Sequence, residues 1–203
     1  MWDLKDKLVV ITGATNGIGK AAALEIAKHG PRMLLTFRNQ GLADNLSLEL
    51  QAVNPNLKLD FLYCDFSSQE SIRGCAAEIL ALQQQIDVLV NNAGVVNTAY
   101  RETLEGIENT FAVNHLGYFL LTNLILEQML GEEETRIINV SSAAHSFVKK
   151  INWPDINFKD NFGMGVTAYG HSKLANLLFT RYLATKLSTS NVTVNAIHPG
   201  GVN

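Results

Sequence analysis

Short apolar runs alternate with longer amphipathic segments along most of this chain of 203 residues. Six apolar runs predict strands, because strands that are buried on both faces have nearly continuous apolar sequence. The expected strands are residues 7–12, 32–37, 57–63, 86–92, 136–141 and 191–198. Segments with helical spacing lie between them, at residues 18–29, 41–53, 68–84, 103–130 and 168–188. In the fourth of these segments we expect a break near Gly106.

This alternation predicts an α/β fold: a doubly wound parallel sheet of the Rossmann type, with residues 1–203 forming a single domain. No repeat or linker divides the chain. The aromatic, irregular segment 147–166 reads as an insertion near a substrate site. Ligands of open α/β sheets bind beyond the carboxyl ends of the strands. The sequence stops just past the sixth expected strand, where we expect another wall of the ligand pocket.

A glycine-rich turn, TGATNGIG, joins the first expected strand to the first expected helix. Residues without a Cβ permit a tight turn and let the backbone approach a pyrophosphate. The free N–H groups and the dipole at a helix N-terminus favour such an anion. The turn therefore predicts a dinucleotide site, with contacts from Gly13, Thr15, Asn16, Gly17, Ile18 and Gly19.

The end of the second expected strand bears on which dinucleotide binds. An acidic residue at this place would hold the ribose 2′-hydroxyl of NAD. The chain has Phe37-Arg38 instead. The planar guanidinium of Arg38 could pair with a 2′-phosphate, which favours NADP(H) over NAD(H). The alternative is a solvated surface arginine.

Composition argues against several other classes of function. The net charge of −3 speaks against a nucleic-acid surface or a polybasic membrane patch. No apolar run is long enough for a transmembrane segment, and the N-terminus lacks the pattern of a signal peptide. Neither the two cysteines nor the five histidines have metal-ligand spacing, so no metal site is expected. These features predict a protein of a reducing, cytoplasmic compartment.

The segment TAYGHSK places Tyr169 and Lys173 four positions apart in an expected helix, and therefore on one face. A free tyrosine has a pKa of about 10, and a nearby ammonium favours the phenolate and lowers that pKa. Such a tyrosine can give or take a proton near neutral pH. A tyrosine and a lysine with this spacing are also common on helix surfaces. Motifs elsewhere in the chain must therefore decide whether this is a catalytic pair or a surface pair.

Six motifs occur in the order and at the spacing typical of one family, which the chain resembles: the short-chain dehydrogenases/reductases. They are TGATNGIG at 12–19, NNAG at 91–94, VNHLG at 113–117, INVSS at 138–142, YGHSK at 169–173 and HPGG at 198–201. The insertion, with INWPDINF at 151–158, is similar to that of the retinol-dehydrogenase-like group, which includes the WW-domain oxidoreductase. Members of the family usually continue with a substrate-binding segment and a last strand, and we expect this chain to lack both.

The resemblance implies roles for the residues that match these motifs. Tyr169 would be the acid/base, and Lys173 would bind the nicotinamide ribose and lower the pKa of the tyrosine. Ser142 would hydrogen-bond the substrate oxygen, and Asn114 would hold a water of a proton relay. His145, just past Ser142, is the histidine best placed to touch the substrate.

Further cofactor contacts follow from the same resemblance. Asp65 would lie near the adenine amino group. The other matching residues would lie beside the adenosine ribose or the nicotinamide, and they are Asn92, Ala93, Gly94, Pro199 and Gly200.

The sequence thus predicts an NADP(H)-dependent oxidoreductase that moves a hydride between nicotinamide and the carbonyl or alcohol of a lipophilic substrate, such as a retinal-like or steroid-like compound. The alternative is a truncated, non-catalytic dinucleotide-binding or interaction variant of such a reductase. A sugar-nucleotide epimerase is disfavoured, since those chains are longer and the NNAG motif and the insertion point elsewhere.

The sequence leaves open how the insertion packs and how copies of the chain associate. The apolar residues of the insertion would either line a substrate pocket or pack the loop onto the body. They are Phe147, Ile151, Trp153, Ile156, Phe158, Phe162 and Met164. Family members often associate through two long helices, which implies a homodimer or homotetramer that buries parts of 103–130 and 168–188.

Overall fold

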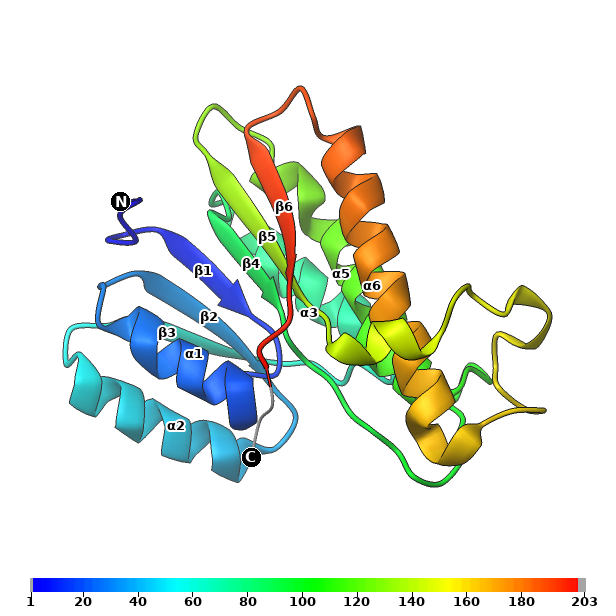
Figure 1. Ribbon diagram of the computed structural model, residues 1–203. Coiled ribbons are helices and arrows are strands. Elements are labelled where there is room, and N and C mark those ends of the chain that lie inside the picture. The colour runs from blue at the N-terminus through cyan, green and yellow to red at the C-terminus, as the bar shows by residue number, and fades with distance from the viewer. Residues whose placement is uncertain (1, 201–203) are drawn as a thin grey trace.

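The computed structural model describes residues 2–200, which form a six-stranded sheet in the order β3-β2-β1-β4-β5-β6 (Figure 1). All pairings are parallel. The strands are β1 (Leu8–Ile11), β2 (Arg32–Phe37), β3 (Lys58–Tyr63), β4 (Val88–Asn91), β5 (Thr135–Val140) and β6 (Val192–Ile197). Each expected strand is present, and the strand order reverses between β1 and β4. The predicted doubly wound parallel sheet is therefore confirmed.

Helices cover both faces of the sheet (Figure 1). One face carries α1 (Gly17–Ala27) and α2 (Gln40–Val53), and the other carries α3 (Gln69–Ala81), α5 (Gly117–Ile125) and α6 (Val166–Lys186). Polar side chains begin the first three of these helices by accepting a backbone N–H at the N-cap position. The capping residues are Asn16, Asn39 and Ser68.

Two apolar clusters explain why β1 has no polar position. Val9 and Ile11 belong to the cluster under α1 and α2. Leu8 and Val10 belong to the cluster under α3, α5 and α6. Because successive side chains of a strand point to opposite faces, a strand with helices on both sides must be apolar throughout.

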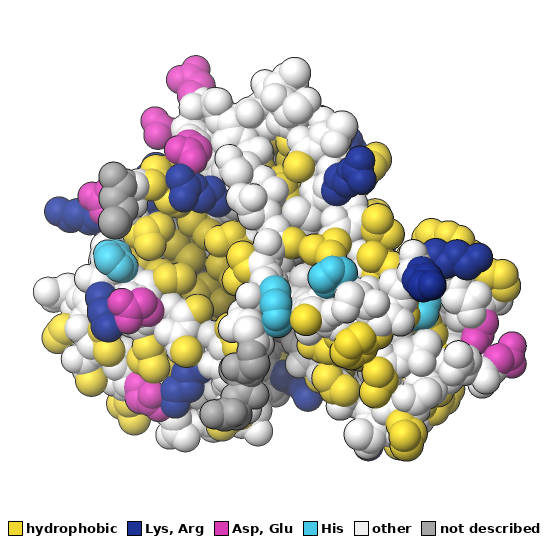
Figure 2. Space-filling model, in the orientation of Figure 1, with side chains coloured by type: hydrophobic (Ala, Val, Ile, Leu, Met, Phe, Trp, Pro, Cys, Tyr) yellow, Lys and Arg dark blue, Asp and Glu magenta, His cyan; other side chains and the backbone are white. Residues whose placement is uncertain are grey.

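At the other end of the sheet, β6 is covered on one face only. Val192 and Val194 are buried against the cluster that contains α6 residues, whereas Thr193, Asn195 and Ile197 are exposed. Among the helices of residues 2–200, none lies over the outer face of β5 and β6 in Figure 1. Figure 2 shows hydrophobic side chains gathered in a hollow on this side of the molecule. This part of the sheet is therefore accessible in the described chain.

The helical region expected at 103–130, with a break near Gly106, is present only after that break, and the prediction of helix for residues 103–108 was wrong. Helix begins at Asn109 with the short α4 (Asn109–Phe111), continues as a π-helical turn (Ala112–Leu116) into α5, and ends as a 3-10 turn (Leu126–Met129). The start is set by Glu108, whose carboxylate accepts the N–H groups of Thr110 at 2.8 Å and Phe111 at 2.7 Å. Gly106 lies in the preceding turn with a φ of 74°, outside the helix.

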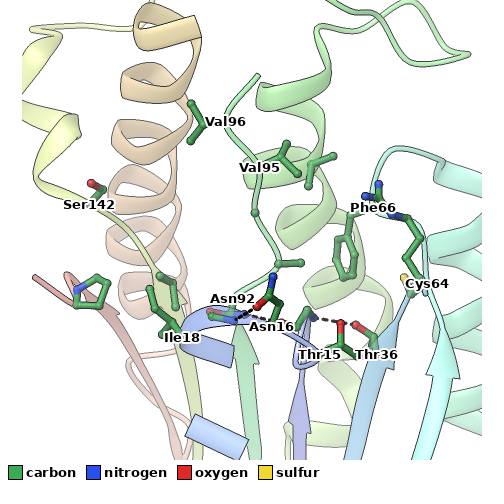
Figure 3. Close-up of a pocket in the computed structure, with 18 of the residues that line it drawn as sticks. Thr15, Asn16, Ile18, Thr36, Cys64, Phe66, Asn92, Val95, Val96 and Ser142 are labelled. Carbon is green, nitrogen blue, oxygen red and sulfur yellow. Dashed lines mark hydrogen bonds between the residues drawn. The ribbon is translucent and has the colours of Figure 1, made fainter. Parts of the chain in front are cut away.

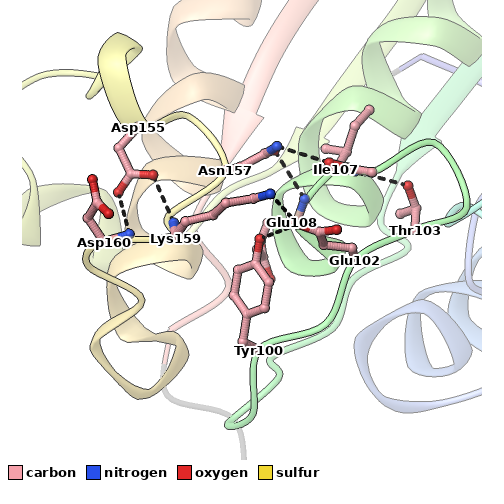
Figure 4. A network of polar contacts seen from close by, with 10 residues as sticks. Tyr100, Glu102, Thr103, Ile107, Glu108, Asp155, Asn157, Lys159 and Asp160 are labelled. Atoms are coloured by element: carbon pink, nitrogen blue, oxygen red, sulfur yellow. Dashed lines mark hydrogen bonds and ion pairs between the residues drawn. The ribbon is translucent and has the colours of Figure 1, made fainter.

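The insertion is irregular, as expected, with 3-10 turns at Trp153–Asp155 and Gly163–Gly165, and a further 3-10 turn at Ala143–Phe147 leads into it. Figure 4 shows how it is tied to the loop before α4. The Asn157 amide donates to the Gly106 carbonyl at 2.9 Å, and its oxygen accepts from the Glu108 N–H at 3.3 Å. Lys159 forms an ion pair with Glu102 at 3.0 Å.

An aromatic anchor completes this attachment. Phe158 is 1% exposed, and its ring centroid lies 5.8 Å from that of Phe111 and 5.0 Å from that of His171. Phe111 precedes the π-helical turn, and His171 belongs to α6. The insertion therefore packs against both helical segments that carry candidate catalytic residues.

We expect Phe158→Ala to lower the free energy of unfolding by about 3–5 kcal/mol, because it removes a buried aromatic side chain and leaves a cavity. Urea unfolding of the full-length protein measures this change. Trp153→Ala is the matched control: Trp153 lies in the same insertion but is 74% exposed, so a change within about 0.5 kcal/mol is expected. Equal effects of the two substitutions would contradict the anchor role of Phe158.

Candidate active site

A cavity of about 530 Å³ opens at the carboxyl ends of the strands. It is bounded by the glycine turn, by the segments that follow β2, β3, β4, β5 and β6, and by α6 (Figure 3). Most of the predicted site residues line it: Gly13, Thr15, Asn16, Gly17, Ile18, Arg38, Asp65, Asn92, Ala93, Gly94, Ser142, Tyr169, Lys173, Pro199 and Gly200. Three predicted residues do not line it: Gly19, Asn114 and His145.

The glycine turn packs tightly against the end of β4. Gly13 has a φ of 63°, and a Cβ on it would lie 2.7 Å from the Cα of Ala93. A Cβ on Gly19 would lie 2.4 Å from the Asn92 side-chain nitrogen and 2.4 Å from the Gly13 carbonyl oxygen. Gly19 is buried, so in this structure it supports the turn and does not border the cavity.

Two residues that the sequence analysis did not single out hold the turn in place. Thr36, at the end of β2, accepts the Gly13 N–H at 3.1 Å. The Thr12 hydroxyl accepts the backbone N–H groups of Asn92 at 2.8 Å and Ala93 at 3.0 Å. Thr12 belongs to the TGATNGIG motif, but neither bond can be predicted from the sequence, because the partners are distant along the chain.

The turn and helix α1 suit a pyrophosphate. Asn16 caps α1 by accepting the Gly17 N–H at 2.8 Å, and the N-terminus of the helix borders the cavity. A glycine-rich turn that leads into a helix N-terminus is an arrangement that binds phosphate groups. The residues present therefore fit a dinucleotide.

Arg38 and Asp65 lie at the end of the cavity formed by β2 and β3. The Arg38 side chain is 62% exposed, and its Nη1 lies 3.8 Å from Asp65 Oδ1. The same Asp65 oxygen accepts the Ser67 N–H at 2.9 Å and the Ser67 hydroxyl at 2.7 Å. The long ion pair leaves the donors of the guanidinium available to a ligand.

Tyr169 and Lys173 lie one turn apart on α6, and both border the cavity. The Lys173 Nζ atom is 5.5 Å from the centroid of the Tyr169 ring and donates to the Val140 carbonyl at 3.0 Å. Lys173 is 4% exposed, and burial lowers its pKa to about 8. The sequence motif therefore corresponds to a phenol and a buried ammonium close together in one cavity.

Ser142 follows β5 and faces the same cavity (Figure 3). Its hydroxyl oxygen accepts the Ala144 N–H at 3.2 Å at the start of a 3-10 turn. Because this bond uses the oxygen as an acceptor, the hydroxyl proton can be donated to a ligand.

Asn114 is fully buried in the π-helical turn. Its side chain accepts the Val95 N–H at 2.8 Å and donates to the Val95 carbonyl at 2.9 Å and to the Ser172 hydroxyl at 3.3 Å. It therefore clamps the segment after β4 onto α6. Its own backbone carbonyl accepts from Asn176 at 2.9 Å and retains a second lone pair. The water-binding role of Asn114 remains a prediction, and this carbonyl is the Asn114 group with free acceptor capacity.

Three histidines near the motifs are held by protein groups. His145 Nδ1 lies 2.7 Å from the Ser142 carbonyl oxygen, and a substrate contact by His145 remains a prediction. His171 is buried away from the cavity, with Nδ1 2.9 Å from the Thr167 carbonyl oxygen. Burial lowers the pKa of His115, which bonds Asn176. Residues 2–200 contain no cluster of potential metal ligands.

Four of the seven apolar residues of the insertion pack onto the body. Ile151 and Phe158 form a buried cluster with Phe111, Ala168 and Ala175, and Ile156 and Phe162 pack against it partly buried. None of the seven lines the cavity within the described part of the chain. Phe147, Trp153 and Met164 are exposed and show neither packing nor a place in the cavity. A role of the insertion near a substrate remains a prediction.

The fold and the cavity define a dinucleotide-binding Rossmann domain with a serine, a tyrosine and a lysine beside the nucleotide site. The family model for the short chain dehydrogenases matches residues 7–155 and 158–203. The chain therefore belongs to the short-chain dehydrogenase family.

Relatives and solved structures agree with this assignment. Retinol dehydrogenase 12 of Mus musculus is 43% identical over 196 residues, which are 97% of this chain and 61% of that protein. The chain thus spans about three fifths of the length of this relative. A metagenomic short-chain oxidoreductase in complex with NADP has a TM-score of 0.79 and 28% identity, with coverage of 98% of this chain and 85% of that chain. NAD+-bound xylitol dehydrogenase has a TM-score of 0.78 and 25% identity, with coverage of 98% and 71%.

Among the helices of residues 2–200, none has the length and apolar character needed to span a bilayer.

Proposed function

We propose that the protein is an NADP(H)-dependent oxidoreductase that transfers a hydride between nicotinamide and the carbonyl or alcohol of a lipophilic substrate. The observation that carries this proposal is that Ser142, Tyr169 and Lys173 border one cavity with the glycine turn. The similarity to a retinol dehydrogenase supports a substrate that is an apolar aldehyde, ketone or alcohol.

The chain's own residues would handle the proton. The bound cofactor supplies or accepts the hydride at the substrate carbon. In reduction, Tyr169 donates a proton to the substrate oxygen, and in oxidation it takes that proton back. The charge of the Lys173 ammonium stabilises negative charge that develops on the phenol oxygen during proton transfer, and Lys173 binds the nicotinamide ribose. Ser142 donates a hydrogen bond from its hydroxyl to the same substrate oxygen, keeps its proton, and stabilises negative charge there.

Further contacts belong to the same proposal. Asp65 would lie at the adenine and Pro199 and Gly200 at the nicotinamide, while Asn114 would support a proton relay through its carbonyl. His145 would touch the substrate. A cytoplasmic location completes the proposal, and the free, buried thiols of Cys64 and Cys75 support a reducing compartment.

We expect Tyr169→Phe to lower turnover by at least about 10²-fold, because the proton donor is lost. NADPH affinity should remain within about threefold, since the ring and the fold are kept. Steady-state kinetics with a panel of apolar aldehydes and a fluorescence titration with NADPH measure the two effects in the full-length protein.

Tyr100→Phe, in the exposed loop before α4, is the control. Turnover close to that of the unaltered protein would exclude Tyr169 as the acid/base. NADPH binding by the unaltered protein without turnover of any substrate would favour the non-catalytic variant.

Arg38 carries the cofactor preference. Solved relatives hold either NADP or NAD+, so the family alone does not decide the preference. Arg38 is exposed beside the cavity, and no acidic residue occupies its place at the end of β2. Its fork suits a 2′-phosphate, and this contact favours NADP(H).

We expect Arg38→Ala to weaken NADPH binding about 10- to 100-fold, because charge-assisted hydrogen bonds to the 2′-phosphate are lost. NADH binding should change by less than about threefold. Parallel fluorescence titrations measure both affinities. Arg73→Ala, which removes an exposed arginine from α3, is the control. Equal losses for the two cofactors would refute the assignment.

We also propose that a second copy of the chain packs against α5 and α6. Phe119 on α5 is 45% exposed, and Leu178 on α6 is 49% exposed. The Phe119 ring lies 5.3 Å from the buried Phe179, so the exposed apolar surface is continuous with the core.

Light scattering of the full-length protein at micromolar concentration is expected to give a dimeric or tetrameric mass. Replacement of Phe119 and Leu178 by glutamate should reduce that mass to a monomer, because charged side chains are costly to bury at an interface. A monomeric mass for the unaltered protein would contradict this interface.

A further inference from the structure

A tyrosine outside the family motifs lies next to the candidate catalytic lysine. Tyr118, on α5, is 0% exposed, and its ring centroid lies 6.0 Å from Lys173 Nζ. Within the described residues, its hydroxyl has no hydrogen-bond partner. Like Asn114, four positions earlier, it lies against α6: Asn114 donates to the Ser172 hydroxyl, and Tyr118 lies beside Lys173.

The charge on Lys173 needs stabilisation from its surroundings. The lysine is buried, and no carboxylate lies within 4.0 Å of it among residues 2–200. Its electron-rich neighbours are the Val140 carbonyl at 3.0 Å and the rings of Tyr169 at 5.5 Å and Tyr118 at 6.0 Å. Aromatic faces at about 6 Å or less attract an ammonium, and more strongly where water is excluded.

We propose that Tyr118 is a positioning residue for the proton-transfer chemistry, and that its aromatic ring stabilises the buried ammonium of Lys173 beside Tyr169. This inference rests on the proposed oxidoreductase function. It assigns a role to a residue that the mechanism above does not use.

The ring is the acting part of Tyr118. Burial raises the pKa of its hydroxyl well above the usual value of about 10, so Tyr118 stays neutral and cannot replace Tyr169 as the acid/base. Among the residues that border the cavity, the other titratable groups are Tyr169 on α6, His198 in the segment after β6, Cys64 after β3, and Arg38 and Asp65 near β2 and β3.

The test compares Tyr118→Phe, which keeps the ring, with Tyr118→Leu, which removes it. The readout is the pH dependence of kcat for alcohol oxidation by the full-length protein. The alkaline limb is the fall of kcat at high pH, and it reports loss of the charge on Lys173, which is coupled to Tyr169. Without the ring, the ammonium loses its proton at lower pH. We expect Tyr118→Leu to move the alkaline limb down by about 0.4–1.4 pH units, and Tyr118→Phe to leave it within about 0.2 units.

Two further variants separate this effect from loss of packing. Ile125→Ala removes another fully buried side chain from α5, about two turns from Tyr118, and should leave the limb in place. Tyr118→Met also lacks a ring, but its unbranched, flexible side chain can fill the space differently from Leu. It should shift the limb as Leu does, and it serves if the Leu variant does not fold.

Three outcomes overturn the inference. The first is an alkaline limb that stays in place or moves to higher pH in the variants without a ring. The second is an equal shift of the limb in Tyr118→Phe, which would make the hydroxyl the acting group. The third is an equal shift of the limb in Ile125→Ala, which would make the effect one of packing. The outcome is separable from that of the proposed function. If Tyr169→Phe abolishes turnover while Tyr118→Leu leaves the profile unchanged, only the role of Tyr118 fails. If Tyr169→Phe keeps turnover, the assignment of Tyr169 as the acid/base of the proposed function fails first.

Discussion

The close contact between the glycine turn and the end of β4 is the constraint on which the rest of the structure depends. A Cβ at Gly13 would come within 2.7 Å of the Ala93 backbone, so only glycine allows this approach. The Thr12 hydroxyl accepts two N–H groups from the β4 end and donates to the Val90 carbonyl at 3.3 Å. These bonds hold β1 and β4 side by side where the strand order reverses, which is the place where such sheets bind their ligands.

A chain of buried amides and hydroxyls extends this constraint to the candidate catalytic residues. Asn91 on β4 donates to Asn139 on β5 at 2.8 Å, and Asn139 donates to Thr180 on α6 at 2.9 Å. Thr180 and Asn176 share this helix, and Asn176 donates to the Asn114 carbonyl at 2.9 Å. Buried polar groups that are paired in this way specify one arrangement, because each unpaired group would be costly. The network therefore aligns α6, with Tyr169 and Lys173, against the ends of β4 and β5.

The insertion serves the same arrangement from the outside. Phe158 packs between Phe111 and His171, and Asn157 ties it to the turn before α4. The segment thus stabilises the junction between the helix that holds Asn114 and the helix that holds Tyr169. Its exposed aromatic residues lie outside the cavity. The structure therefore explains how the insertion is attached to the body, through Phe158 and Asn157.

The sequence by itself determined the features that depend on local chemistry. Strand positions were predictable because strands buried on both faces need continuous apolar runs, and the glycine turn because only glycine suits its geometry. The shared face of Tyr169 and Lys173 followed from helical spacing. The start of helix at Asn109 was missed although its cap is local, because the capping residue is Glu108 and glutamate is not a residue type that marks an N-cap. Tertiary structure alone decided the clamping role of the Asn114 side chain and the proximity of Tyr118 to Lys173. Both depend on partners distant in sequence, such as Val95 for Asn114 and Lys173 for Tyr118, and local periodicity carries no information about such partners.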